Sequence, residues 1–168
     1  MLARVRSLYE KLLEAIAVVL MVGLAAEVTL GVVFRTLGHS LVWYDEVAAI
    51  TLTWITFYGS ALAALRGAHI GVPSLVDAMP RSARLAVTLV AEACVIGFFV
   101  LLAWVGFSVL DVLATDFLVS IPEVSVMYTQ SVIPIGATLF VIAELLRLPE
   151  VVRVAAGNGD DGSKGSAS

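Results

Sequence analysis

The chain has 168 residues, of which 60% are hydrophobic and only 14% are charged. Soluble domains typically carry a charge on about a quarter of their residues, so this composition excludes an ordinary soluble domain. The formal net charge of −4, without a basic stripe along the chain, also excludes a typical nucleic-acid-binding protein, and no nucleic-acid partner is expected.

Four long apolar stretches fill most of the chain, at about residues 12–34, 47–65, 85–110 and 124–146. A helix rises about 1.5 Å per residue and a bilayer core is roughly 30 Å thick, so about 20 apolar residues can cross it. Backbone groups in hydrocarbon cannot bond to water, so each stretch must close its own hydrogen bonds as a helix. The sequence therefore predicts an all-α integral membrane protein with four transmembrane helices over residues 1–149. Residues 150–168 are expected to form a polar, disordered tail.

The positions of the basic residues predict how these helices are oriented, because Lys and Arg are kept on the cytoplasmic side during insertion. They gather before the first stretch, between the second and third, and after the fourth, whereas the two other connections carry only Arg35. Both termini are therefore expected to be cytoplasmic. The two external connections are acidic and hold Asp45, Glu46, Asp111, Asp116 and Glu123.

Glu27 lies inside the first stretch, with Gly23 and Gly31 four residues before and after it. A charge within a span costs about 2.5 to 3.5 kcal/mol unless it is paired, neutralised or wetted, so Glu27 should not face lipid. Small residues on the same stripe allow another backbone to approach closely. Three interpretations remain open: a packed contact with a protonated or hydrogen-bonded Glu, an ionic contact to another subunit, or part of a proton or ion pathway.

Aromatic and acidic residues open the second stretch. Trp43 and Tyr44 suit the membrane interface, where an aromatic ring is half apolar and half wet. Asp45 is expected to cap the helix, and Asp45 and Glu46 both oppose the positive end of the helix dipole. The same two carboxylates are alternatively a contact for an external protein.

Arg66 and His69 close the second stretch at its cytoplasmic end. Glu92 lies two turns into the third stretch from the same side, so Arg66 and His69 are its expected ion-pair partners. Arg66 can otherwise extend to the lipid headgroups, and His69 can simply lie at the interface. One such pair is far short of a relay of titratable groups through the membrane.

The remaining polar inventory is poor in chemistry. Pro134 is the only proline inside a predicted stretch, and it leaves the Gln130 carbonyl without its usual helical donor. Cys94 has no second cysteine for a disulfide or a metal site. His39 and His69 both lie outside the stretches, which argues against haem ligation within the bundle. We therefore predict no catalytic, cofactor-binding or metal-binding residue.

Three motifs follow one another along the chain: Trp43-x-Asp45-Glu46, then Arg66-x-x-His69-Ile70-x-Val72, then Ser131-x-x-Pro134-x-Gly136. In this order, within four spans, they resemble the small Q-type (DctQ-like) membrane subunit of TRAP transporters, the tripartite ATP-independent periplasmic transporters. The resemblance covers about residues 7–147.

The resemblance implies a multi-pass protein of the bacterial inner membrane that works in ion-gradient-driven import of an organic acid. Its expected partners are a large multi-span membrane subunit, which would hold the substrate and any sodium, and a periplasmic solute-binding protein. This chain would brace the large subunit and contribute to docking of the binding protein. The candidate contact residues are Glu27, Asp45, Glu46, Arg66, His69 and Glu92. The alternative is a free-standing four-helix membrane protein, either an oligomeric channel or carrier or a quinone-linked redox protein.

Overall fold

The computed structural model describes residues 2–67 and 80–155. Its helices are α1 (Leu2–Thr36), α2 (Tyr44–Arg66), α4 (Arg81–Leu113), the short α5 (Val126–Gln130) and α6 (Val132–Ala155). Within these residues, four helical segments are long and apolar enough to cross a membrane, the fourth running through α5 and α6. The prediction of an all-α membrane protein with four spanning helices is therefore confirmed.

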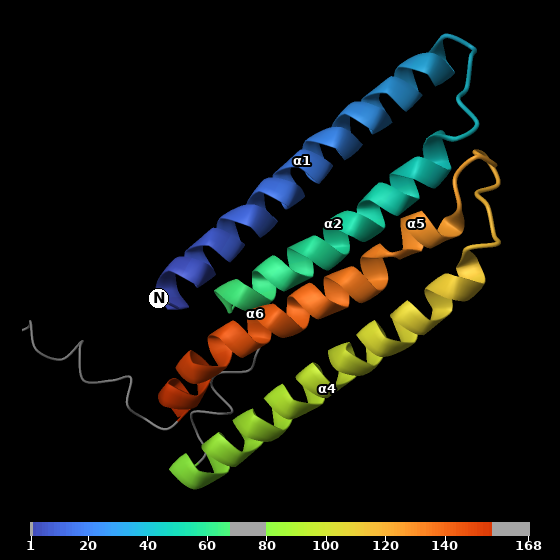
Figure 1. Ribbon diagram of the computed structural model, residues 1–168. Coiled ribbons are helices and arrows are strands. Elements are labelled where there is room, and N and C mark those ends of the chain that lie inside the picture. The colour runs from blue at the N-terminus through green and yellow to red at the C-terminus, as the bar shows by residue number, and fades with distance from the viewer. Residues whose placement is uncertain (1, 68–79, 156–168) are drawn as a thin grey trace, which may run out of the picture.

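The helices lie side by side in a single layer, in the order α1, α2, α6, α4 (Figure 1). Helix α2 packs between α1 and α6, and α6 packs between α2 and α4. The connections 37–43 and 114–125 lie together at one end, which we call the outer end; the opposite end is called the inner end (Figure 1). Because the helices form one layer, two broad apolar faces remain open to lipid or to a partner.

Close contact between α2 and α6 forms the centre of the layer. Gly136 permits this contact, because a Cβ atom there would lie 2.6 Å from Cβ of Phe57. The Phe99 ring of α4 stacks on the Phe140 ring of α6, with the ring centres 3.7 Å apart. The buried core is small and rich in alanine, consisting of Leu13, Ala61, Ala64, Leu65, Phe140 and Ala143. Small side chains at this contact let neighbouring backbones approach closely, as membrane helices commonly do.

The helices are longer than the apolar stretches that predicted them. Helix α1 has 35 residues and α4 has 33, so each is about 50 Å long against a bilayer core of roughly 30 Å. Each helix must therefore tilt in the membrane, or its ends must extend into the headgroup region. Helix α6 continues to Ala155, which makes the start of the expected disordered tail helical. The rest of that tail, residues 156–168, lies outside the described residues.

The fourth span is interrupted at Ser131, next to the Gln130 carbonyl that Pro134 leaves without its usual helical donor. A proline has no N–H to offer the carbonyl four residues earlier, and its ring crowds that carbonyl. Beside the interruption, the Trp54 indole of α2 donates a hydrogen bond of 2.9 Å to the Thr129 carbonyl. A side chain from the neighbouring helix thus satisfies a backbone group close to the interruption. A second proline, Pro149, lies inside α6 beyond the predicted stretch.

The connection between α4 and α5 folds back on itself, and we call residues 116–126 the outer hairpin. Phe117 and Ser125 form an isolated antiparallel bridge, and the Leu118 N–H bonds to the Val124 carbonyl at 3.0 Å. The Ser125 hydroxyl accepts a hydrogen bond of 3.2 Å from the Met127 N–H and so caps α5. These bonds give the outer hairpin a defined shape.

Replacing Gly136 with Ala tests the contact between α2 and α6. The added methyl group would overlap Phe57, so we expect the variant to lose about 1 to 3 kcal/mol of stability. The measurement is thermal unfolding of the purified chain in detergent. Gly97→Ala is the matched control, because a Cβ at Gly97 would meet nothing within 4 Å. Equal melting temperatures for the two variants would contradict the packing described here.

Candidate docking and subunit contacts

At the outer end, the Glu46 carboxylate joins the first turn of α2 to the outer hairpin. Its Oε1 accepts a hydrogen bond of 3.2 Å from the Val119 N–H, and its Oε2 accepts one of 2.8 Å from the Ser120 N–H. The Ser120 hydroxyl also donates to the Val42 carbonyl at 3.3 Å, which links the two outer connections. Hydrogen bonds to an ionised carboxylate are among the stronger ones in proteins. Glu46 is therefore a positioning residue for the outer hairpin.

Asp45, the residue before Glu46, is placed differently. Helix α2 begins at Tyr44 with Trp43 as its N-cap, and no side chain forms a cap hydrogen bond there. The prediction that Asp45 caps the helix is therefore wrong. Asp45 instead lies exposed in the first turn together with Glu46. Both carboxylates oppose the positive end of the helix dipole from this position, as the sequence predicts.

The outer end presents an acidic surface with exposed apolar side chains. Val119 is 91% exposed at the tip of the outer hairpin and Val42 is 82% exposed beside it. The exposed charged residues are Asp45, Asp111, Asp116 and Glu123, against the single base Arg35. We call six of these residues the outer surface: Val42, Asp45, Asp111, Asp116, Val119 and Glu123. Acidic groups and apolar groups side by side are suited to contact with a basic protein surface.

At the inner end, Arg66 ties α2 to α1. Its Nε lies 2.8 Å from Glu10 Oε1 and its Nη2 lies 3.0 Å from Glu14 Oε2. In the described part of the chain, Arg66 thus pairs with α1 and not with Glu92, so the predicted Arg66–Glu92 ion pair is wrong. The physical reason is the order of the layer, because α4, which carries Glu92, packs on α6, and α6 lies between α4 and α2. The other expected partner, His69, lies outside the described residues.

A second set of contacts at the inner end holds α1 against α2 and α6. Arg6 Nη1 lies 2.7 Å from Glu150 Oε2, and Arg6 Nη2 donates to the Leu65 carbonyl at 3.1 Å. The Tyr9 hydroxyl donates to the Leu139 carbonyl at 2.6 Å. The ion pairs are partly exposed, so each contributes little alone. Sequence reasoning missed these contacts, although acidic and basic residues gathered at the same end of the predicted helices.

Glu144 is a further acidic residue that sequence reasoning missed. Its side chain is only 2% exposed, and Arg147 Nη1 lies 3.9 Å from its Oε2. The Arg147 side chain also passes over Gly67, where an added Cβ would lie 3.0 Å from the guanidinium Nε. Gly67 ends α2 with φ at 68°, a left-handed conformation that favours glycine. The sequence did contain a signal for this pair, because Glu144 and Arg147 are three residues apart and so share a helix face.

Glu27 and Glu92 are not brought together by the fold. They lie on α1 and α4, which form opposite edges of the layer (Figure 1). Glu27 is half-buried, and its Oε1 is buried with no hydrogen-bond donor among residues 2–67 and 80–155. In the same residues, no three His, Cys, Asp or Glu side chains gather into a group that could hold a metal ion. Glu27 and Glu92 are therefore two separate candidate contact points.

Comparison with known families gives a match over most of these elements. Residues 24–154 match the family described as "Tripartite ATP-independent periplasmic transporters, DctQ component". The matched range extends from within α1 to near the end of α6 and includes the three motifs on which the resemblance was based. A comparison with curated proteins gives no match.

Glu46→Ala tests the role of this carboxylate at the outer hairpin. Removing the acceptor of two charge-assisted hydrogen bonds should speed hydrogen exchange at the Val119 and Ser120 amides by about tenfold or more. The measurement is hydrogen–deuterium exchange of the chain in detergent, followed by mass spectrometry. Asp45→Ala is the control, since it removes a neighbouring exposed carboxylate and should leave these amides unchanged. Unaltered exchange in Glu46→Ala would refute the assignment.

Proposed function

The chain belongs to the DctQ component of the tripartite ATP-independent periplasmic transporters, and from this premise we propose that it is the static bracing subunit of an importer. The family is a transporter component and not an enzyme family, and the chain is a multi-pass membrane protein. We place it in the bacterial inner membrane, beside a large membrane subunit and a periplasmic solute-binding protein. The importer would take up an organic acid at the expense of an ion gradient, with the substrate and any coupling sodium on the large subunit.

The single layer of tied helices is the observation that supports the bracing role. Arg66 and Arg6 join α1 to its neighbours at the inner end, and Glu46 joins α2 to the outer hairpin at the other. Transporter substrate sites are usually built from pairs of broken helices in repeated halves. Among the described residues, the one interruption within a span is at Ser131. The described layer therefore has broad faces for packing but lacks the pair of broken helices from which a substrate site is usually built.

The outer surface supports a contribution to docking of the binding protein. With both termini in the cytoplasm, as the distribution of basic residues predicts, the outer end would face the periplasm. The exposed acids there would attract a basic patch on the binding protein and raise its rate of encounter. Glu46 would act indirectly, because its carboxylate is committed to the outer hairpin. Asp45 is the exposed acid beside it and the better candidate for direct contact.

Reconstitution in liposomes tests the bracing proposal. We expect this chain alone neither to transport nor to conduct, and to be recovered with the large membrane subunit when the two are expressed together. Uptake should require all three components: the large subunit, which would hold the substrate sites, this chain, and the binding protein. Transport or ion conduction by liposomes that contain only this chain would favour a free-standing channel or carrier and overturn the proposal.

Asp45→Lys tests the docking proposal. Reversing this exposed charge should lower uptake by the complete transporter severalfold at low salt and weaken its dependence on salt, since surface charges are screened over about 8 Å at physiological ionic strength. Uptake is measured across a series of ionic strengths. Val154→Lys introduces the same side chain at an exposed position of the inner end and should leave both quantities unchanged. An equal response of the two variants would rule out docking through Asp45.

A further inference from the structure

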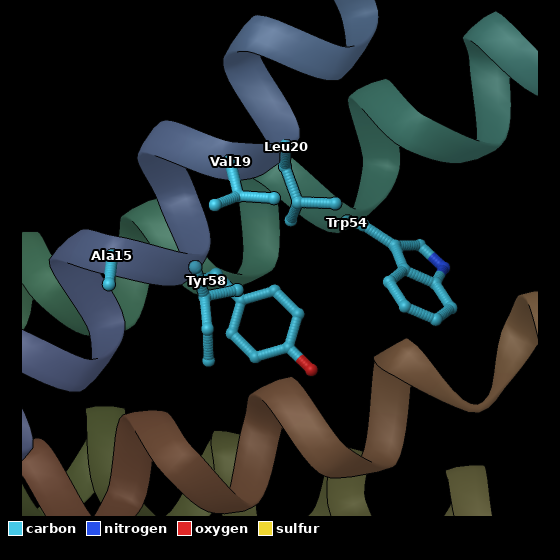
Figure 2. A pocket seen from close by; sticks show the side chains of 6 residues that line it. Ala15, Val19, Leu20, Trp54 and Tyr58 are labelled. Carbon is cyan, nitrogen blue, oxygen red and sulfur yellow. The ribbon is translucent and has the colours of Figure 1, made fainter.

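A groove of about 370 Å³ lies between α1 and α2 on one broad face of the layer (Figure 2). Figure 2 shows the Trp54 and Tyr58 rings between the ribbons of α1 and α6. Trp54 is held in place because its indole N–H donates to the Thr129 carbonyl at 2.9 Å. The groove is open to the outside, as Val19 in its wall is 69% exposed. Its lining residues are Ala15, Ile16, Val19, Leu20, Trp54 and Tyr58.

Glu27 lies on α1 directly beyond the outer end of this groove. Seven residues separate Leu20 from Glu27, which is close to two full turns of about 3.6 residues each. The two side chains therefore leave α1 on nearly the same side, about 10 Å apart along the helix. The apolar groove and the carboxylate thus belong to one continuous strip of the same broad face.

The Glu27 carboxyl group needs a partner that the described part of this chain does not supply. Its Oε1 is buried without a hydrogen-bond donor, while the residue as a whole is only half-buried. Leu30, three residues further along the same helix, is apolar and 54% exposed, so it lies beside Glu27 on the open side of α1. A carboxylate in such surroundings costs several kcal/mol unless a donor or a positive charge reaches it. Oε2 is not among the buried unsatisfied atoms, so a donor from a partner would reach the carboxyl group through this oxygen.

A membrane-spanning helix meets both requirements better than a lipid does. An acyl chain would fill the apolar groove, but it carries no hydrogen-bond donor. Lipid headgroups carry donors but lie at the membrane surface, whereas Glu27 is seven residues, or about 10 Å, inside the end of the predicted span at Phe34. A helix can place apolar side chains in the groove and a basic side chain at the depth of Glu27.

We propose that a membrane-spanning helix of the large subunit packs along this strip, with apolar side chains in the groove and a Lys or Arg side chain against Glu27. This inference rests on the proposed function, because it requires a large partner subunit. It deepens that function by choosing the face of the layer and the chemistry of the contact. The opposite broad face is left to lipid or to other contacts.

Site-specific photocross-linking in the assembled transporter tests which face is used. p-Benzoylphenylalanine is introduced in place of Val19, in the groove, or of Met21, which is also exposed but lies about 200° further around α1. We expect a cross-link to the large subunit from position 19 and none from position 21. Cross-links from position 21 alone, or from position 19 to lipid alone, would overturn the inference. Because either result is obtained on a complex that still assembles, the bracing proposal would stand.

Variants of Glu27 test the charged contact. Glu27→Leu should lower the amount of large subunit recovered with the tagged chain by about tenfold or more, and Glu27→Gln should lower it less. Thr29→Val is the control, because the Thr29 hydroxyl is exposed and bonds only to the Ala25 carbonyl of its own helix. The isolated Glu27→Leu chain should melt in detergent no lower than the wild type. Undiminished recovery, or a loss of stability in the isolated chain, would show that Glu27 serves only contacts within this chain. Failure of the wild-type chain to recover any large subunit would instead refute the proposed function.

Discussion

In hydrocarbon, a backbone carbonyl or N–H has no water to bond, and this constraint accounts for most of the polar contacts in the layer. Hydroxyl groups return to their own helix, as Thr51 does to the Val47 carbonyl at 2.9 Å and Thr138 to the Pro134 carbonyl at 2.7 Å. Beside the interrupted span, the Trp54 indole crosses from α2 to serve a carbonyl. Charged side chains gather at the two ends, where water and headgroups are available.

The one-layer arrangement determines which of these groups remain for a partner. In a closed four-helix bundle, each helix would direct one face inward, and an acid such as Glu27 would find its donor among its neighbours. Here α1 packs mainly on α2 and reaches α6 at the inner end through Arg6 and Tyr9, so much of its outer half is open. An unsatisfied carboxyl oxygen on this edge helix is therefore informative about what lies beside it, in a way that an apolar side chain is not.

Sequence reasoning succeeded where the physics is local and failed where it depends on which helices are neighbours. The apolar stretches predicted the spans, and Pro134 indicated which carbonyl loses its helical donor, because both effects act within one helix. The pairing of Arg66 with Glu92 was wrong, since no periodicity reveals that α6 separates α2 from α4. The cap assigned to Asp45 failed because the N-cap is Trp43, two residues earlier, and helix boundaries are uncertain by one or two residues. Glu144 was missed because its burial depends on the packing of α6 between two helices.

The interruption at Ser131 also has a mechanical consequence for a subunit that receives a partner at its tip. The short α5 is fastened to α2 through Trp54 and is continuous with the outer hairpin, whereas α6 is fastened through the central contact at Gly136. The position of the tip is therefore set by α2 as well as by α6, because α5 is bonded to the one and continues into the other.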